Sequence, residues 1–373
     1  MPTLHLRIET PVQRSGPSAW QPSATDVAAL DRAAEILRSG GTVAMPTETV
    51  YGLAANALDP VAVEKIFLAK QRPHWDPLIV HVCDRAMTHS VVASISHVAQ
   101  LLIDTFWPGP LTLLLPRSAL IPDVVTAARP LIGVRMPRHP VAVELIRRAG
   151  LPLAAPSANR FGHISPTTAA HVLEDLDGRI DAVLDAGPSD CGVESTVLDP
   201  TQQPLLLYRP GAIASEEIAS VLAPIGATLR EWNPAMLVTQ PREALPSPGV
   251  GLRHYAPRAR LILVPAHRQS IAAILQRLTP AELPAGLLLP QNLPGSTSTA
   301  LAASLVFPWG DWLQLESMAE SLYAGLRHLD SAGCRTILAP VPEPSGIGAA
   351  IQDRLRKAAI PTDETAPSAA LTI

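Results

Sequence analysis

The chain contains few cysteines, few aromatic residues and few charged residues. Of its 373 residues, 4% are aromatic, 17% are charged and three are cysteines, Cys83, Cys191 and Cys334. The cysteines lie far apart and form no CxxC pair, which argues against a zinc site or a disulfide framework and is typical of a reducing compartment. The 11 histidines are scattered as well. We therefore expect no tightly bound metal ion.

Membrane and nucleotide-loop signals are also missing. No apolar stretch reaches membrane-spanning length, and the N-terminus lacks the apolar segment of a signal peptide, so we expect a cytoplasmic protein that makes no membrane contact. The net charge of -4 provides no general attraction to nucleic acid. A GxxxxGK[ST] loop and a GxSxG elbow are absent, which excludes a P-loop and leaves no basis for a Ser-His-Asp triad.

The remaining sequence indicates a protein of two α/β domains. Residues 1–22 carry no clear period and are expected to form a tail or an edge strand. From 23 to 225, strand-like and helix-like segments alternate irregularly, which favours a mixed α/β sheet. Residues 226–258 have little periodicity and are interpreted as a linker or a functional loop. A regular alternation of strands and helices returns from 259 to 373 and predicts a smaller Rossmann-like domain.

Residues 43–82 form the stretch around which the first domain is organised. Apolar, β-branched runs at 42–45 and 78–82 predict two buried strands. Between them we expect a helix that begins after Asp59 as its N-cap and ends at Lys70. This order brings two strand ends and the basic end of a helix to one place.

That place offers hydroxyls, cations and an imidazole, from Thr47, Thr49, Lys70, Arg72 and His81. Basic residues in a last helical turn complement the helix dipole, so capping alone accounts for Lys70 and Arg72. Hydroxyls and cations together are also what a polyphosphate or a small zwitterion requires. From these residues alone, helix capping and a phosphate site both stay open.

Two arginines at strand ends need partners. Arg135 stands in an apolar run at 131–136. A buried guanidinium is costly without a carboxylate, which Glu48, Glu194 or a substrate can supply. Arg209 poses the same question at the end of another strand-like run.

Three polar residues at strand ends have two interpretations each. Ser157 and Asn159 follow a strand-like run and either bind a ligand or satisfy their own turn through hydrogen bonds from side chain to backbone. Ser195 follows Glu194 and is either a site hydroxyl or an ordinary strand residue. Spacing alone does not separate these alternatives.

Taken together, an ordered series of motifs resembles the long form of the threonylcarbamoyl-AMP synthase family, a YrdC-like domain followed by a C-terminal extension. The motifs of the first domain are PTETVYGL (46–53), KQR (70–72), PLIVHV (77–82), WPGPLTLLL (107–115), GVRMP (133–137), PSAN (156–159), SPT (165–167), ESTV (194–197) and YRPG (208–211). SPGVGLRHYAP at 247–257 resembles the family's interdomain loop, and DRLRKAA at 353–359 resembles the end of its extension. The resemblance covers residues 24 to about 360.

The resemblance implies a mixed, twisted YrdC-like sheet with helices, followed by a smaller Rossmann-like α/β domain. The implied enzyme is a nucleotidyltransferase that condenses L-threonine, bicarbonate and ATP to threonylcarbamoyl-AMP and releases pyrophosphate. Mg²⁺ is expected to accompany ATP. The product serves threonylcarbamoyl modification of the adenosine beside the anticodon in tRNA, so tRNA or downstream threonylcarbamoyl-transferase proteins are expected partners.

The resemblance also implies which residues bind each substrate. L-threonine would be held by Thr49, His81, Arg135, the backbone at Ala155, and Ser195. ATP would be held by Lys70, Arg72, Asp76, Leu131, Ser157, Asn159, Ser165, Arg209 and Ser247. Lys70 and Arg72 would act in catalysis by stabilising charge on the phosphates. The linker around Ser247 would fold over the nucleotide as a lid.

The sequence departs from the family pattern at two of these positions. Asp76 stands where the family usually has Asn, and a carboxylate near phosphates is unfavourable unless a cation compensates it. Leu131 stands where Thr is frequent, which costs nothing if the contact there is made by the backbone.

Two alternative functions remain open. A related carbamoyl-transfer maturation enzyme with a YrdC-like domain would also need zinc-binding segments, and the missing CxxC pairs count against it. A non-enzymatic RNA-binding module would need a local basic surface, because the net charge of the chain is -4.

Overall fold

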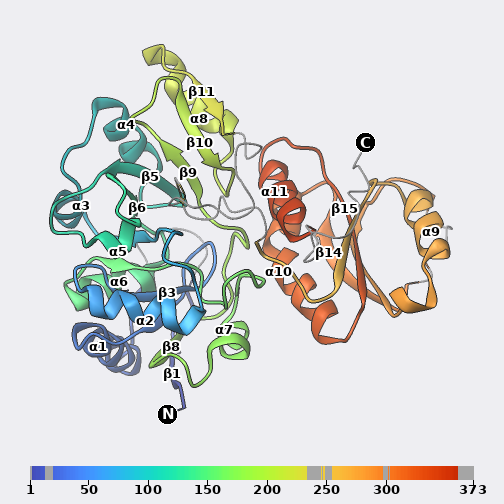
Figure 1. The fold of residues 1–373 in the computed structure, drawn as a ribbon, viewed down its shortest axis with the longest axis horizontal. Helices are drawn as coiled ribbons and strands as arrows, with labels where there is room; N and C mark the ends of the chain where they lie inside the picture. The colour runs from blue at the N-terminus through green and yellow to red at the C-terminus, as the bar shows by residue number, and fades with distance from the viewer. Residues whose placement is uncertain are drawn as a thin grey trace.

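The computed structural model describes residues 2–12, 20–232, 245, 247, 254–296, 301 and 303–359. Within these residues the strands form two separate sheets, one of 11 strands and one of four. The two sheets and their helices lie side by side along the longest axis of the molecule (Figure 1). The predicted fold class, a mixed α/β sheet followed by a smaller α/β unit, is confirmed.

The larger sheet is mixed, with parallel and antiparallel neighbours. Its order is β1 (Leu4–Arg7), β8 (Ala182–Asp185), β2 (Val43–Met45), β3 (Gly52–Asn56), β7 (Leu153–Ala154), β4 (Ile79–His81), β6 (Leu131–Arg135), β5 (Leu111–Pro116), β9 (Thr196–Asp199), β10 (Leu205–Arg209) and β11 (Leu229–Glu231). β4 and β6 are parallel, and their register places His81 opposite Arg135. Two predicted site residues are therefore neighbours at the ends of adjacent strands.

Helices cover both faces of this sheet. They are α1 (Ala24–Arg38), α2 (Pro60–Lys70), α3 (Arg85–Val91), α4 (His97–Phe106), α5 (Asp123–Thr126), α6 (Pro140–Ala149), α7 (Ala169–Leu176) and α8 (Ser215–Leu222). α1 and α6 pack on one face around Leu30 and Leu145. α2, α4 and α7 contribute to a second apolar cluster, which includes Ile66 and Leu102. Buried side chains on both faces fix the strands that carry the site.

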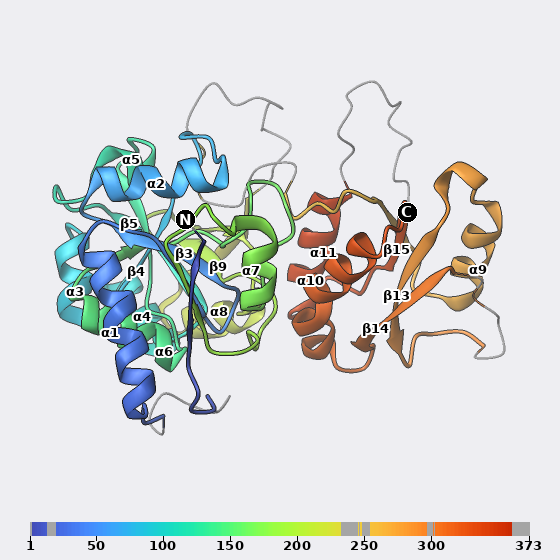
Figure 2. The same ribbon diagram turned by 90° about the horizontal axis from the view of Figure 1, so that it is seen from below.

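The smaller sheet is parallel throughout and has the order β12 (Arg260–Val264), β15 (Thr336–Pro340), β13 (Ala285–Gln291), β14 (Leu305–Asp311). Its helices are α9 (Arg268–Arg277), α10 (Leu315–Ser331) and α11 (Gly348–Ala358). α10 and α11 face the larger domain (Figure 2), and Arg327 of α10 pairs with Glu174 and Asp175 of α7. Among the described residues, no helix combines the length and the apolar character that a membrane crossing requires.

Three details of the first domain differ from what simple sequence patterns suggest. The N-cap of α1 is Ser23, because Asp26 occupies the third helical position and completes a capping box with it. α7 begins after Thr168, although the Ser-Pro pair at 165–166 is typical of an earlier helix start. Between the turn at 47–49 and α2, the chain forms strand β3, which the alternation of apolar residues did not reveal.

The two ends of the first domain compare differently with expectation. Of the two alternatives for the first 22 residues, a tail or an edge strand, the structure has an edge strand, β1, which pairs with β8 in parallel. β11 falls inside the predicted linker at 226–258 and extends the larger sheet beside β10. Most of the rest of that linker, and residues 360–373 of the second domain, lie outside the described residues.

Candidate active site

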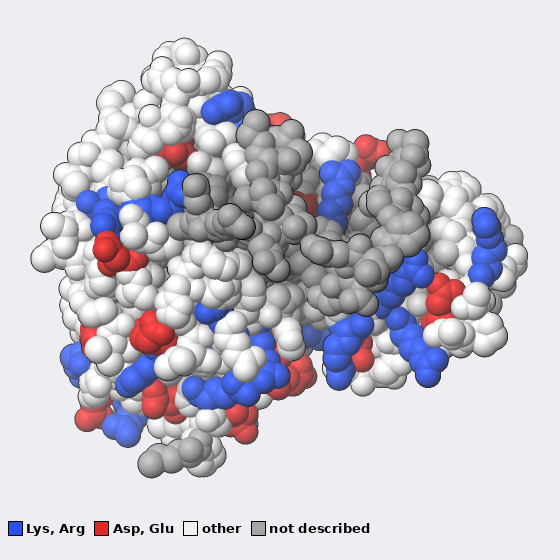
Figure 3. Space-filling model, viewed as in Figure 1, with Lys and Arg blue, Asp and Glu red and all other residues white. Residues whose placement is uncertain are grey.

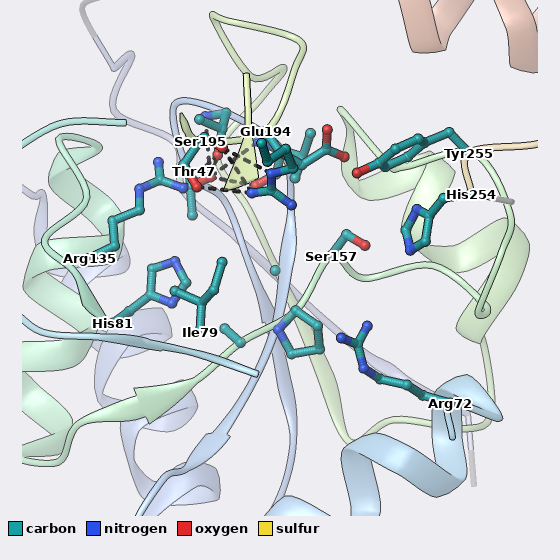
Figure 4. Close-up of a pocket in the computed structure, with 16 residues that line it drawn as sticks. Thr47, Arg72, Ile79, His81, Arg135, Ser157, Glu194, Ser195, His254 and Tyr255 are labelled. Carbon is teal, nitrogen blue, oxygen red and sulfur yellow. Dashed lines mark hydrogen bonds between the residues drawn. The ribbon is translucent and has the colours of Figure 1, made fainter. Parts of the chain in front are cut away.

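A cleft opens where β4, β6 and β10 end and where β3 and β9 begin (Figure 4). The predicted site residues that line it are Thr49, Arg72, His81, Arg135, Ala155, Ser157, Ser195 and Arg209. Lys70, Asp76, Leu131, Asn159, Ser165 and Ser247 do not belong to its lining. Arg135 and His81 stand on one side of the cleft, and Arg72 stands on the opposite side.

Arg135 is held by a carboxylate of the same domain. Its Nη2 lies 2.8 Å from Glu48 Oε1, its Nη1 donates to Thr49 Oγ1 at 2.9 Å, and its Nε donates to the Gly109 carbonyl at 3.3 Å. Burial would raise the pKa of Glu48, but the neighbouring guanidinium outweighs burial and holds that pKa below its usual value. Of the three partners that the sequence allowed, the structure therefore selects Glu48, and the guanidinium still reaches the cleft.

His81 is a neutral imidazole in the same wall. Burial and the Arg135 charge lower its pKa to about 3, so the ring carries no charge near pH 7. Its Nδ1 is buried and has no hydrogen-bond partner among the residues that the structure describes. The ring therefore has a polar atom available for a ligand in the cleft.

Arg209, the last residue of β10, is hydrogen-bonded to Ser195. Its Nη2 donates to the Ser195 carbonyl at 2.9 Å and to Ser195 Oγ at 3.1 Å. Thr112 Oγ1 lies 2.8 Å from the same hydroxyl. Ser195 is therefore a hydroxyl held in the cleft wall, and its role in ligand binding stays a prediction.

Lys70 is buried behind the cleft rather than exposed at a helix end. Helix α2 is capped by Asp59, which accepts from the Val61 amide at 2.9 Å, and it ends where Gln71 adopts a left-handed conformation with φ 55°. Lys70 Nζ donates to the carbonyls of Ser157, at 2.6 Å, and of Asn159. Its hydrogen bonds thus cross to another loop, so simple helix capping does not account for this lysine.

Burial controls the charge at this end of the cleft. Burial and the Arg72 guanidinium lower the pKa of Lys70 well below its usual value. Arg72 lies 2.9 Å from Asp76 Oδ1 and donates to the carbonyls of Asp76 and Pro77 at 3.1 and 2.7 Å. The cation that compensates Asp76 is therefore Arg72. Because Asp76 lies beside two basic side chains, Arg72 and Lys70, an anionic ligand would favour the charged forms of both.

The other predicted residues outside the lining have structural contacts. Asn159 Nδ2 donates to the carbonyls of Arg160 and His163 at 2.7 and 2.8 Å, and its buried Oδ1 has no partner in the described part of the chain. Ser165 Oγ donates to Glu194 Oε1 at 2.6 Å. Leu131 begins β6 and is four positions before Arg135, and Ser247 is fully buried. The roles assigned to these residues stay predictions.

Sequence reasoning did not assign a site role to Glu194, His254 or Tyr255, all of which line the cleft. Glu194 was considered only as a partner of Arg135, because its own partners come from a distant part of the chain. His254 and Tyr255 form one wall, opposite Arg135 (Figure 4). His254 and Tyr255 belong to the motif at 247–257, and that motif is the sequence signal that could have found them.

Two family models match consecutive parts of the chain. The model described as "Telomere recombination", for Sua5, YciO and YrdC, matches residues 35–211. The model described as "Threonylcarbamoyl-AMP synthase, C-terminal domain" matches residues 213–360. The first match covers β2 to β10 of the larger sheet, and the second covers α8, β11 and the whole smaller sheet.

Relatives match along most of the chain. Threonylcarbamoyl-AMP synthase of Pyrococcus abyssi is 42% identical over 326 residues, which cover 87% of this chain and 92% of the relative. The protein of the same name from Bacillus subtilis is 42% identical over 332 residues, which cover 88% of this chain and 92% of the relative. The crystal structure of P. abyssi Sua5 complexed with L-threonine has a TM-score of 0.82 and 37% identity, with 96% of this chain and 97% of that chain covered. The sequence-based recognition is thus confirmed, and the chain belongs to the threonylcarbamoyl-AMP synthase family.

Proposed function

We propose that this chain condenses L-threonine, bicarbonate and ATP into threonylcarbamoyl-AMP and releases pyrophosphate. The observation that carries the proposal is the cleft, which has an anchored guanidinium and a neutral imidazole on one side and buried cations on the other. The relatives named threonylcarbamoyl-AMP synthase match along most of their length, and one solved relative is complexed with L-threonine.

The Arg135 side of the cleft suits an amino acid. A guanidinium has five N–H donors, and Glu48, Thr49 and Gly109 use the sides that face the protein. The remaining donors would bind the threonine carboxylate in a bidentate manner. His81 Nδ1 and the Ser195 hydroxyl would contact the other polar groups of threonine. The Ala155 backbone would complete this wall.

The Arg72 side suits the phosphates of ATP. Lys70, Arg72 and Arg209 supply positive charge, and Asp76 compensates only part of it. A phosphate near Lys70 would favour the protonated ammonium and so raise its lowered pKa. Ser157 and Asn159, whose carbonyls already bind Lys70, would fix the nucleotide at the same loop.

The reaction then needs positioning and charge stabilisation rather than a covalent nucleophile. The amine of threonine and bicarbonate form a carbamate with loss of water. A carbamate oxygen attacks the α-phosphorus, a new P–O bond forms, and the bond to pyrophosphate breaks. Lys70, Arg72 and Arg209 would stabilise the charge that develops on the phosphates. The walls of the cleft hold the two reactants at attacking distance and limit the access of water.

Mg²⁺ would accompany ATP and neutralise part of the phosphate charge. No group of three or more His, Cys, Asp or Glu side chains is placed to hold a metal within the described part of the chain. The residues therefore fit an ion bound mainly by phosphates and water, which is typical of Mg²⁺. The unpartnered Oδ1 of Asn159 and the carboxylate of Asp76 would bind water molecules of its hydration shell.

Transfer to tRNA would follow as a separate step. The activated product would pass to a downstream threonylcarbamoyl-transferase that modifies the adenosine beside the anticodon. On the face shown in Figure 3, acidic and basic side chains are mixed over both domains outside the grey atoms. This mixture, together with the net charge of -4, favours a small-molecule enzyme over a nucleic-acid-binding module.

Pyrophosphate release tests the proposal. Purified protein would be incubated with ATP and Mg²⁺ while threonine and bicarbonate are omitted in turn. We expect release that requires both. Release that is indifferent to threonine would refute the assigned substrate, and no release would move the interpretation to the nucleic-acid-binding module.

A further inference from the structure

The carboxylate of Glu194 lines the catalytic cleft, yet the second domain supplies two of its three donor residues. Tyr323 on α10 donates its hydroxyl at 2.8 Å to Oε2, and Arg354 on α11 donates its Nε to the same oxygen at 2.7 Å. Ser165 of the first domain donates to Oε1 at 2.6 Å. These four residues, which we term the Glu194 cluster, are all buried.

The charge of this cluster is fixed by the second domain. Burial alone would raise the pKa of Glu194, but Arg354, Arg209 and the hydrogen bonds outweigh burial and hold its pKa at about 2. The Arg354 side chain is fully buried, donates its Nη1 to the Pro210 carbonyl at 3.0 Å, and lies 5.2 Å from the centroid of the Tyr255 ring. One guanidinium thus contacts the catalytic domain and the aromatic wall of the cleft.

Apolar packing places α10 directly behind the same segment. Gly192 has a φ of 69°, and a Cβ there would lie 2.2 Å from the Ala319 carbonyl oxygen. Val50 and Val193 of the first domain share one buried apolar cluster with residues of α10 and α11 and with Tyr255. The loop that leads to Ser195 is therefore supported from behind by the second domain.

We propose that Tyr323 and Arg354 are positioning residues of the active site. They fix the Glu194 carboxylate and, through the adjacent Ser195, the wall of the cleft that contacts threonine. This inference rests on the proposed function and assigns the second domain a part in substrate binding. Arg209 still holds Ser195 when a donor to Glu194 is lost, so the cleft wall should shift rather than collapse. The effect should therefore appear first as a weaker affinity for threonine.

The test uses the full-length protein with Tyr323→Phe, Arg354→Met and Arg354→Lys. Tyr323→Phe removes one hydroxyl and keeps the ring that packs on Tyr255 at 5.7 Å, so the variant should fold. We expect it to raise the KM for threonine about threefold to tenfold, since it removes a hydrogen bond to a charged group. Arg354→Met should raise that KM at least about tenfold, because it leaves Glu194 without its buried counter-ion. Arg354→Lys keeps a positive charge and should raise the KM for threonine less than Arg354→Met does.

Two controls separate positioning from general destabilisation. Arg356→Met changes an exposed arginine of α11 and should leave KM and kcat within about twofold, as surface substitutions usually do. In a Glu194→Gln background, Tyr323→Phe should add less than its separate effect, because both changes act on one hydrogen-bond network.

Two results would overturn the inference. An active wild type whose Tyr323→Phe and Arg354→Met variants keep the KM for threonine, even with a lower Tm, would reduce the cluster to a structural interface. A wild type without threonine-dependent turnover would refute the proposed function and the positioning role with it. The wild-type assay distinguishes the two failures.

Discussion

The two ends of the cleft differ in how their charges are compensated. At the Arg135 end, Glu48 pairs with the guanidinium and His81 is neutral, so the protein balances its own charges. At the opposite end, Asp76 lies beside two buried basic side chains, Arg72 and Lys70, and burial together with Arg72 lowers the pKa of Lys70. A balanced end suits a zwitterion, whereas a polyanion would hold both basic side chains of the other end in their charged forms.

Among the substitutions, removal of Arg135 should have the largest effect on threonine-dependent turnover and on stability. Arg135→Met takes away the donor for the threonine carboxylate and leaves Glu48 buried without its cation, which should cost about 3–5 kcal/mol of unfolding free energy. We expect threonine-dependent turnover to fall at least about 100-fold, as for the loss of a charged contact. Steady-state kinetics and urea unfolding measure the two effects.

A matched control and a rescue accompany this prediction. Arg147→Met changes an exposed arginine of α6 and should behave like wild type. Adding Glu48→Gln to Arg135→Met should restore part of the stability but not the turnover, because no carboxylate is then left uncompensated. An unchanged KM for threonine in Arg135→Met would contradict the assignment of this end.

Loss of Lys70 should have the next largest effect, which we expect in the kinetics with ATP. Lys70→Met removes a cation from the phosphate end and leaves the carbonyls of Ser157 and Asn159 without their donor. We expect kcat/KM for ATP to fall about 10- to 100-fold, because charge stabilisation in a buried site is strong. Lys65→Met on the exposed side of α2 is the control. Wild-type kinetics in Lys70→Met would limit this residue to a structural role.

Asp76→Asn should have a smaller effect on the use of ATP, and it should strengthen ATP binding rather than weaken it. The substitution keeps the side-chain shape and removes the negative charge that now faces Arg72 at 2.9 Å. Because the phosphate end becomes more positive, we expect the KM for ATP to fall about two- to fivefold. A KM that rises more than about tenfold would indicate instead that the carboxylate is needed.

The last prediction concerns how the stability of the protein depends on pH. His81 and His139 have pKa values lowered to about 3 and about 4, so the unfolded chain binds protons that the native protein does not bind. The free energy of unfolding should therefore fall as the pH is lowered from 7 to 5, by at most about 1.4 kcal/mol per pH unit for each histidine. Denaturant unfolding across this range measures the slope.

Substitution of one histidine tests whether that residue contributes to the pH dependence of the free energy of unfolding. His139→Gln removes one of these groups and should make the slope shallower. A free energy of unfolding that stays constant between pH 7 and pH 5 would show that neither histidine is buried in the neutral form.

Much of the fold could be predicted from local sequence. α2 begins after its N-cap Asp59 and ends at Lys70, as expected, because capping residues and apolar spacing are local signals. β3 was missed because its sequence, GLAAN, has no β-branched residue and owes its conformation to pairing with β2 and β7.

The candidate site was predictable where motifs carry it and not where distant segments meet. The motifs at 46–53, 133–137 and 208–211 contain Thr49, Arg135 and Arg209, so the sequence alone identifies these three residues. The partners of Glu194 could not be found in this way, because Tyr323 and Arg354 lie 129 and 160 positions away. Spacing in a sequence does not encode such a contact.

The most direct test of the two-ended cleft is calorimetric titration of each variant with threonine and with a non-hydrolysable ATP analogue. We predict that Arg135→Met loses threonine binding and keeps the nucleotide, and that Lys70→Met keeps threonine and binds the nucleotide more weakly. If both variants lost both ligands to the same extent, the division of the cleft into a threonine end and a phosphate end would be wrong.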